Sequence, residues 1–221
     1  TFVLLLVTSS YSQLINNNWY YGYGAGLNFD TSPPTSFGGI NSISQEASNA
    51  VSDRNSGALL YYTNSDTIYD ASNNPMPNGM NLMGGGHSSY QGVISVPDPA
   101  DTNRYYVFSV GDASGTSSPP ANWILPYGGF AYHIVDMTMN GGSGDVFIRD
   151  QIIEQIFDSN ANKWFEQRVT AAPHCNGTDY WVVVRREDSL ATSPSLYAYQ
   201  VTATGVQAPV ISNGGFSEKG F

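Results

Sequence analysis

Residues 104–112, RYYVFSVGD, contain a run of Tyr, Val and Phe that ends at a glycine and an acidic residue. Similar segments begin at Gly57 (GALLYYTNSD) and at Asp179 (DYWVVVRRED). Aromatic and β-branched residues favour strands, whereas Gly, Asn and Asp favour turns. A run that is apolar at nearly every position is typical of a strand buried on both faces. The three segments therefore predict three equivalent strands, each covered on both sides.

Each segment occupies the same place in a longer repeat. A strand of small residues is expected before it and an aromatic–polar strand after it. The preceding strands are EASNAVSD, QGVISVPD and RVTAAPHC, and the following ones are TIYDASNN, FAYHIVDM and LYAYQVTA. Successive copies lie about 47 and about 75 residues apart, and the first spacing matches the periods of propeller blades. The longer second spacing predicts insertions within residues 112–129 and 150–165.

This repeat predicts an all-β fold, namely a partial β-propeller (WD40/YVTN-like) with about three blades of roughly four antiparallel strands. The blade-like units are expected at approximately residues 40–90, 91–150 and 168–221. Radial stacking would bury both faces of each sheet. A solenoid or a β-sandwich is the competing interpretation, although sandwich strands would alternate more cleanly. Because a closed ring needs at least about four blades, the chain is expected to be truncated at both ends.

Composition excludes several classes of protein. Charged residues make up 12% of the chain, against about 25% in an average protein, and the formal net charge is −10. Nucleic-acid partners are not expected, because phosphate binding requires a basic surface. The acidic balance is compatible with calcium or with glycans. Cys175 is the single cysteine, so an intrachain disulfide is excluded, and we expect a small, partly buried residue at a strand end.

Residues 1–12, TFVLLLVTSSYS, predict the C-terminal part of a signal peptide. The apolar run is far shorter than the roughly 20 residues that span a bilayer, so no transmembrane segment is expected. Ser10 and Ser12 stand two apart, as small residues do before a signal-peptidase site. A buried first strand is the alternative. The favoured interpretation is a mature domain at residues 13–221 that is secreted or displayed on the cell surface.

Motifs for common chemistries are incomplete. GYGAGL at residues 22–27 has Leu27 where a dinucleotide loop has its last glycine, so nucleotide binding is not expected. His87 lies beside Ser88 and Ser89, but no nucleophile elbow surrounds them. The three histidines, His87, His133 and His174, lack the spacing of a zinc site. His133 is expected within a strand, with one face packed.

Three further groups of residues carry weaker functional hypotheses. Asp136, Asn140 and Asp145 are calcium candidates in a Gly-rich segment, where Asx-stabilised turns are the alternative. Glycoside hydrolysis requires two carboxyl groups in one pocket, and its candidates are Asp70, Asp112, Glu154 and Asp188. Exposed aromatic residues can stack on sugars, or can pack an insertion onto the sheets, and the candidates are Trp123, Tyr127 and Trp164. No catalytic residue and no cofactor is assigned.

Five stretches, in this order, resemble one family: NNWYYGYGAGLNFD, SDRNSGALLYYTNSDTIYD, MPNGMNLMGG, YHIVDMTMNGGSGDV and HCNGTDYWVVV. Together they are similar to the N-terminal propeller-like region of large secreted surface proteins of Bacteroidetes, over residues 17–221. The family usually has a small residue in place of Cys175 and a shorter connection at residues 112–129. The resemblance implies downstream PKD or immunoglobulin-like repeats and a gliding-motility-type sorting domain read by type IX secretion. It implies no catalytic residue.

The sequence therefore predicts a non-catalytic extracellular or cell-surface module of a larger secreted protein, for adhesion or for binding a protein partner or a glycan. A polysaccharide-acting hydrolase or lyase on a propeller scaffold is the alternative, and a structural spacer is a third. Fold alone does not separate these classes, because one fold serves many functions.

Overall fold

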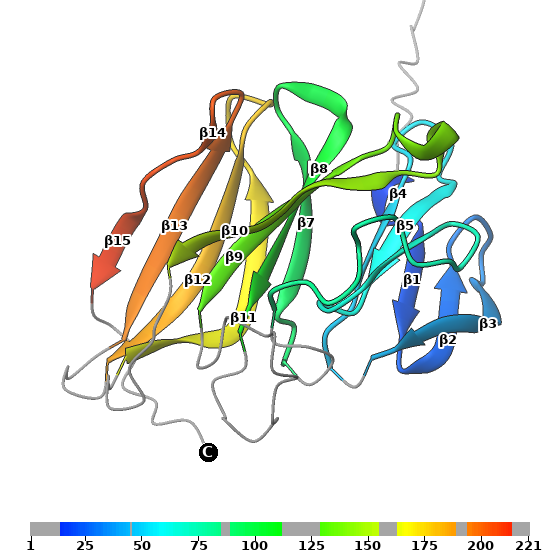
Figure 1. Cartoon of the computed structure of the whole chain (residues 1–221), viewed down its shortest axis with the longest axis horizontal. Coiled ribbons are helices and arrows are strands. Elements are labelled where there is room, and N and C mark those ends of the chain that lie inside the picture. The colour runs from blue at the N-terminus through cyan, green and yellow to red at the C-terminus, as the bar shows by residue number, and fades with distance from the viewer. Residues whose placement is uncertain are drawn as a thin grey trace, which may run out of the picture.

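The computed structural model describes residues 14–44, 46–84, 89–111, 129–154, 163–188 and 194–213 (Figure 1). Strands dominate this part of the chain, and its helical turns are short 3₁₀ segments such as η1 (Leu14–Asn16) and η3 (Asn140–Gly142). Across these ranges, no helix has the length and apolar character needed to cross a membrane. The prediction of an all-β fold is confirmed. The expected signal peptide, residues 1–12, lies outside the described residues.

The described strands form four antiparallel sheets, A to D, in which neighbouring strands of the chain mostly pair with each other. Sheet A contains β1 (Asn18–Tyr21), β2 (Tyr23–Asn28) and β3 (Thr35–Ile43). Sheet B contains β4 (Asn49–Ser52), β5 (Leu59–Thr63) and β6 (Ile68–Asp70). Sheet C contains β7 (Val93–Asp98), β8 (Asp101–Val110), β9 (Phe130–Asp136) and β10 (Asp145–Glu154). Sheet D contains β11 (Lys163–Pro173), β12 (Tyr180–Asp188) and β13 (Ser195–Thr202), with β14 (Gly205–Val206) and β15 (Val210–Asn213) paired to β13.

The repeat found in the sequence corresponds to the order of strands. The three aromatic segments are β5, β8 and β12, and each is the second strand of its sheet. The strands expected before and after each segment are present, and the Ile-rich segment that begins at Asp150 is strand as far as Glu154. Sheet A was not predicted as a further unit. Sheets B, C and D fall where three units were expected, while the division of the chain into blades stays a prediction.

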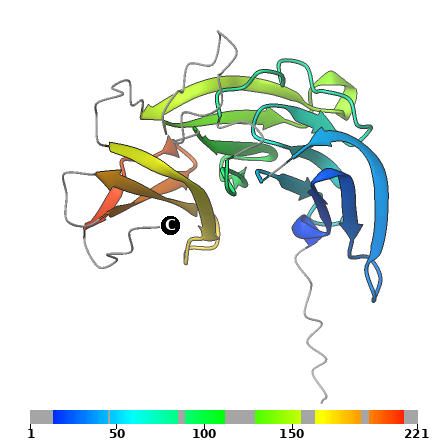
Figure 2. The ribbon, with the colours of Figure 1, turned by 90° about the horizontal axis from the view of Figure 1, so that it is seen from below.

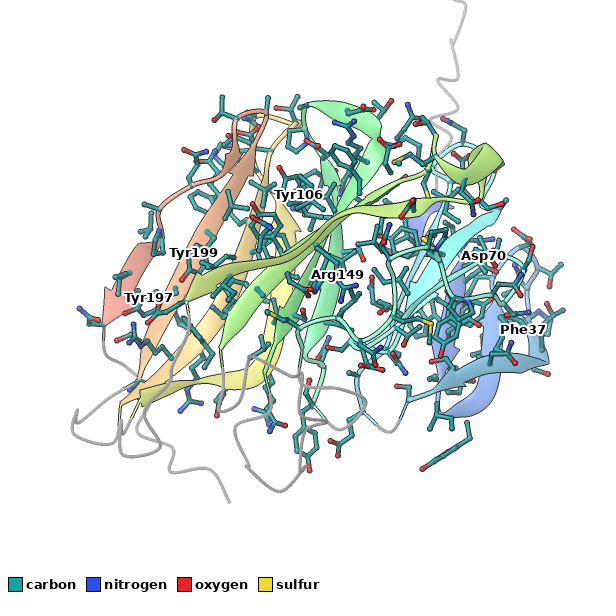
Figure 3. All side chains as sticks on the ribbon, in the orientation of Figure 1. Phe37, Asp70, Tyr106, Arg149, Tyr197 and Tyr199 are labelled. Atoms are coloured by element: carbon teal, nitrogen blue, oxygen red, sulfur yellow. The ribbon has the colours of Figure 1, made fainter. Side chains whose placement is uncertain are left out.

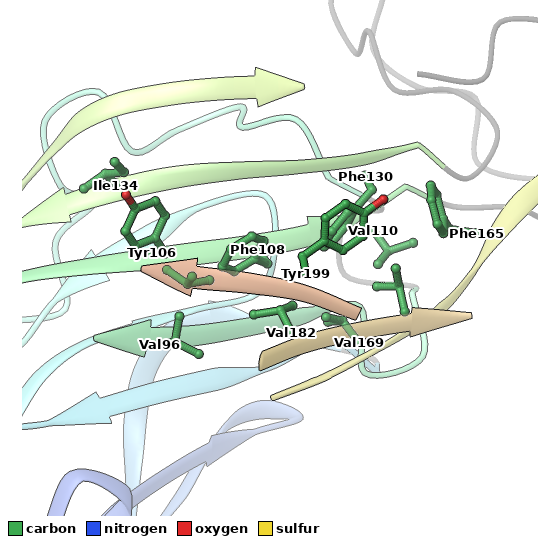
Figure 4. Close-up of a cluster of buried hydrophobic side chains, with 12 residues drawn as sticks. Val96, Tyr106, Phe108, Val110, Phe130, Ile134, Phe165, Val169, Val182 and Tyr199 are labelled. Carbon is green, nitrogen blue, oxygen red and sulfur yellow. The ribbon is translucent and has the colours of Figure 1, made fainter. Parts of the chain in front are cut away.

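Sheet C is covered on both faces, as the continuous apolar pattern of β8 predicts. Tyr106 and Phe108 point into a core shared with sheet D (Figure 4). Tyr105 and Val107, which alternate with them, point into a second core shared with sheet B. Successive strand residues face opposite sides of a sheet, so one strand contributes to both cores.

Sheet A contacts sheet B through a pair of aromatic rings and through side-chain hydrogen bonds. Tyr20 of β1 stacks on Tyr62 of β5 with 4.3 Å between the ring centroids. Asn18 donates hydrogen bonds to Ser52 Oγ at 3.0 Å and to the Gly57 carbonyl at 2.9 Å. Glycine is needed at position 26, because a Cβ there would overlap the ring of Phe37.

The four sheets follow one another along an arc in the order of the sequence, from sheet A to sheet D (Figure 2). The first strands of sheets B, C and D approach one another on the inner side of this arc, where they line a common cavity. This arrangement positions the candidate functional site.

Candidate functional site

A cavity of about 500 Å³ lies where η1, β4, β7 and β11 converge. Its volume falls within the range of about 300–1,000 Å³ that is usual for small-molecule sites. Ala171 and Ala172 on β11 line it opposite residues of β7 that include Val96. The first strands of three successive sheets therefore contribute to the lining of one cavity, together with η1 and Tyr180.

The cavity has apolar walls and a set of polar side chains. Ile15, Ile94, Val96 and Pro173 are among the apolar lining residues. The polar lining residues share hydroxyl, amide or guanidinium groups, and they are Asn16, Asn49, Arg54, Ser95 and Tyr180. Such a combination holds an organic ligand by apolar contact and orients it by hydrogen bonds.

Arg54 supplies the cationic group of the cavity. Among the described residues, its exposed side chain forms no hydrogen bond or ion pair. The neighbouring Asp53 carboxylate accepts hydrogen bonds from the Ser56 hydroxyl at 2.8 Å and from the Ser56 amide at 2.7 Å. These two bonds are the main cause of its lowered pKa, and Arg54 adds a smaller effect. The Asp53 carboxylate is thus hydrogen-bonded within residues 53–56 and does not pair with Arg54. The Arg54 guanidinium remains available to bind an anion.

The ion pairs formed by three other arginines of the described chain lie away from the cavity lining. Arg104 Nε is 2.8 Å from Asp136 Oδ2, and Arg149 Nε is 2.7 Å from Asp150 Oδ2. Arg186 Nη1 is 2.6 Å from Glu154 Oε1. Each of these three arginines has a carboxylate partner. Arg54, in contrast, lines the cavity and has no such partner among the described residues.

A Ser–His–Asp cluster is buried between sheet C and the segment that precedes it. His133 Nε2 lies 3.2 Å from Ser109 Oγ, and His133 Nδ1 lies 3.5 Å from Asp150 Oδ1. These distances approach those of a catalytic triad. However, the Asp150 backbone amide donates a hydrogen bond to Nδ1 at 2.9 Å, so the imidazole proton belongs on Nε2. That proton is directed to the Met83 carbonyl, 3.1 Å away. Nε2 therefore has no lone pair with which to deprotonate Ser109.

The same cluster holds the segment that connects sheets B and C. Ser109 donates a hydrogen bond to the Met83 carbonyl at 2.8 Å, and Asp150 accepts one from the Met83 amide at 2.8 Å. Arg149, labelled in Figure 3, donates to the carbonyls of Asn78, Met80 and Asn81. Burial lowers the pKa of His133, which keeps its ring neutral. The structure assigns a structural role to this cluster, and the prediction of a packed His133 is confirmed.

The calcium candidates are tied to protein partners. Asp136 accepts hydrogen bonds from Thr138 and Arg104, and these bonds lower its pKa although burial acts in the opposite direction. Asp145 accepts a hydrogen bond from the Asn78 side chain, and Asn140 lies exposed in η3. Within the described ranges, no three His, Cys, Asp or Glu side chains gather as a metal site would require. These contacts agree with the alternative of hydrogen-bonded turns, and calcium binding at the three candidates stays untested.

Millimolar calcium is expected to leave the Tm of the protein unchanged relative to the same concentration of magnesium. The Asp136 oxygens already have donors, and a cation would have to displace Arg104. Differential scanning fluorimetry with and without each ion measures this. A calcium-specific rise in Tm that disappears in Asp145→Asn would contradict the expectation.

The candidate carboxylates for glycoside hydrolysis do not form a pair in the described structure. Glu154 is bound to Arg186, and Asp70 accepts hydrogen bonds from the amides of Ser72 and Asn74 in its own turn. Asp112 lies outside the described residues, and Asp188 is described only as the last backbone position of β12. Nothing in these contacts creates an acid–base pair.

The aromatic candidates for sugar stacking are not part of the described site. Trp123 and Tyr127 lie outside the described residues, and only the backbone of Trp164 is described, in β11. The structure instead exposes three aromatic residues of sheet A, Trp19, Tyr21 and Tyr23. For Trp19 and Tyr21 the signal was their alternation within NWYY, because residues two apart in a strand share a face, whereas Tyr23 begins the next strand, β2.

The remaining motifs have structural roles or lie outside the description. GYGAGL is mostly strand β2, while His87 and Ser88 are outside the described residues. The expectation for Cys175 was wrong, because this free cysteine is exposed in the turn between β11 and β12 rather than partly buried at a strand end. His174 accepts the Asn176 amide hydrogen bond in the same turn.

Comparison of the chain with protein-family models, with curated proteins and with solved structures finds no match. The family resemblance and the function therefore rest on the residues and the geometry described above.

Proposed function

We propose that this chain is a non-catalytic ligand-binding module whose four sheets are an arc of a β-propeller. The support for the propeller is the succession of small antiparallel sheets, each packed face to face on the next. In a propeller the first strands of the blades surround the axis. Here β4, β7 and β11 surround the cavity, and this convergence is the observation that carries the proposal.

The proposed ligand of the cavity is an acidic glycan. The unpaired guanidinium of Arg54 fits a sugar carboxylate, with which it can form two parallel hydrogen bonds. Asn49, Ser95 and Tyr180 provide polar groups for sugar hydroxyls. The net charge of −10 repels anions at long range, but physiological salt screens this repulsion beyond about 8 Å. Contact with Arg54 is therefore expected to dominate at the site.

The proposed location is outside the cell or on its surface. Its support is the sequence pattern of residues 1–12 and the resemblance to secreted Bacteroidetes proteins with sorting domains read by type IX secretion. Downstream repeats and a sorting domain belong to the same proposal. The low charge content and the Ser-, Asn- and Gly-rich surface agree with it.

The alternative of a polysaccharide hydrolase or lyase receives no specific support from the described residues. Glu154 and Asp70 are engaged in structural contacts, and Ser109 is buried beside a histidine that cannot act as its base. A binding module and an enzyme differ in turnover, so one assay separates them.

Arg54→Gln is expected to weaken the binding of uronate-containing oligosaccharides by about 10- to 100-fold, because a charged hydrogen bond contributes roughly 1.5–3 kcal/mol. Glycan-array screening would identify the oligosaccharide, and isothermal titration calorimetry would measure its Kd. The matched control is Arg168→Gln, because Arg168 is exposed on β11 and does not line the cavity.

Analysis of the same samples for shortened oligosaccharides tests the absence of catalysis. Retention without products supports the binding module. Products that disappear on substitution of a single carboxylate would establish the enzyme instead. Equal losses of affinity in the two arginine variants would exclude the cavity as the site, and no retained glycan would overturn the choice of ligand.

A further inference from the structure

Polar side chains gather where the cavity meets the interface between sheets B and C. Val51 of β4 and Val93 of β7 lie in the core that these two sheets share. Asn49 and Ser95 stand two positions before and after them in the same strands, so both point into this interface, and both line the cavity. Tyr61 of β5 is fully buried in the same core.

Three polar atoms at this interface lack a hydrogen-bond partner. Asn49 Oδ1, Ser95 Oγ and the Tyr61 hydroxyl are each buried and unpartnered among the residues that the structure describes. Burial raises the pKa of Tyr61 and the Ser95 hydroxyl acts in the opposite direction, so these two hydroxyls are neighbours. Buried polar groups in folded proteins are nearly always hydrogen-bonded. Three unpartnered atoms in one place therefore indicate a partner that arrives with a ligand.

An acetamido group has the complementary chemistry. A carboxamide such as that of Asn49 accepts at Oδ1 and donates from Nδ2, so it can form two hydrogen bonds with a second amide. The Ser95 hydroxyl can donate to the carbonyl of the same group. Apolar side chains that line the cavity, such as Ile94 and Val96, can contact its methyl group. A sugar hydroxyl would use fewer of these polar atoms and would leave the apolar wall uncovered.

The position of Arg54 places the sugar carboxylate on a neighbouring unit. Asn49 begins β4, and Arg54 follows the last residue of that strand, Ser52. A strand rises about 3.3 Å per residue, so the backbones at the two positions are roughly 10 Å or more apart. Such a span suits two linked sugars better than one ring. The cavity of about 500 Å³ is large enough for a ligand of that class.

We propose that the cavity recognises an N-acetylated sugar linked to a uronate, and that Asn49 and Ser95 select the acetamido group. The inference rests on the proposed binding of an acidic glycan, and it adds the second sugar and the residues that recognise it. Arg54 holds the carboxylate. Asn49 and Ser95 reach the ligand by rotation of their side chains, because both residues already line the cavity.

Two disaccharides that differ in one substituent test the proposal. One joins glucuronate to N-acetylglucosamine, and the other joins glucuronate to glucose, so that a hydroxyl replaces the acetamido group. Titration of the wild-type chain followed by nuclear magnetic resonance measures both Kd values. The acetamido disaccharide is expected to bind about 10-fold more tightly, because it forms additional hydrogen bonds with groups that are otherwise unpartnered.

Variants of the cavity assign this preference to its residues. Asn49→Leu removes the amide at similar volume, and the ratio of the two Kd values is expected to fall to about 1. Ser95→Ala is expected to lower the ratio in part. Arg54→Gln is the matched control, because loss of the guanidinium is expected to weaken both disaccharides equally and to leave the ratio unchanged.

The stability of the ligand-free variants separates recognition from a structural role. An apolar replacement of an unpartnered buried group is neutral or stabilising, so the Tm of Asn49→Leu is expected to be no lower than that of the wild type. Asn18→Leu provides the contrast. Asn18 is buried and donates hydrogen bonds to Ser52 Oγ and to the Gly57 carbonyl, so this substitution is expected to lower the Tm. Differential scanning fluorimetry measures both values.

Four results would overturn the inference. Equal affinity of the wild type for the two disaccharides would exclude selection of the acetamido group, and binding that still depends on Arg54 would leave the proposed acidic-glycan site intact. A preference that survives in both Asn49→Leu and Ser95→Ala would place recognition elsewhere. A Tm that falls in Asn49→Leu as it does in Asn18→Leu would mean that buried water already satisfies these atoms. Binding of neither disaccharide would contradict this inference and the proposed function together.

Discussion

Phe130→Ala is expected to lower the free energy of unfolding by about 3–5 kcal/mol, the usual cost of truncating a buried phenylalanine. The Phe130 ring is fully buried and contacts rings from both sheets of the larger core (Figure 4). Its centroid lies 5.3 Å from that of Tyr199 and 5.7 Å from that of Phe165, both on sheet D. The substitution would leave a cavity between sheets C and D that the surrounding β-structure cannot fill.

Urea denaturation followed by tryptophan fluorescence measures this loss. Tyr90→Ala serves as its control, and it is expected to change the free energy of unfolding by no more than about 0.5 kcal/mol, since Tyr90 is largely exposed. Similar losses in the two variants would mean that the interface between sheets C and D contributes little to stability.

Acidification is expected to destabilise the protein through His133. Burial lowers the pKa of His133 in the folded state below its ordinary value of 6.5, although the Asp150 charge acts in the opposite direction. Below about pH 6.5 the unfolded chain binds a proton at this residue that the folded chain does not. The free energy of unfolding therefore falls with decreasing pH, by up to about 1.4 kcal/mol per pH unit, until the pH passes the folded pKa.

Chemical denaturation at a series of pH values between neutrality and the range where carboxylates titrate measures this slope. His133→Gln is expected to be less stable than the wild type near neutral pH, because the Asp150 amide and the Met83 carbonyl lose an ideal partner. Between about pH 6.5 and 5, the free energy of unfolding of this variant should nevertheless fall less steeply with pH than that of the wild type, because the titrating group is absent.

Histidine ring ¹⁵N spectra of the wild type give an independent measurement. The Nε2–H tautomer is expected to persist below pH 6, since Nδ1 accepts the Asp150 amide hydrogen bond. A protonated imidazole at pH 6, or an equal pH slope in His133→Gln, would show that the buried cluster does not control the acid response.

Much of the strand order was predictable from local patterns. β5, β8 and β12 are each recognisable from a short aromatic run, because two-sided burial imposes apolar residues at consecutive positions. The strands of sheet A were harder to predict from the sequence. Its strands include Gly24, Gly26 and Gly38, and glycines carry no strand preference. Its pairing also includes a register shift between Tyr23 and Ala25.

The candidate site was only partly predictable. The small residues of β4, β7 and β11 indicated first strands, but the cavity forms only when three strands from distant parts of the chain converge. No local signal distinguishes Arg54 from the arginines that find carboxylate partners. Arg186 reaches Glu154 across two sheets, and Arg149 reaches carbonyls 68–71 positions away.

The sequence by itself determined the β-rich class, the repeated three-strand pattern and the exclusion of a disulfide framework, because these depend on residue type and local periodicity. Tertiary structure decided which faces are covered, that Arg54 lines a cavity without a carboxylate partner among the described residues, and which ring nitrogen of His133 carries the proton. Those properties depend on contacts between residues far apart in the chain. Such contacts arise from the packing of whole sheets, in which the geometry of each face selects its neighbours.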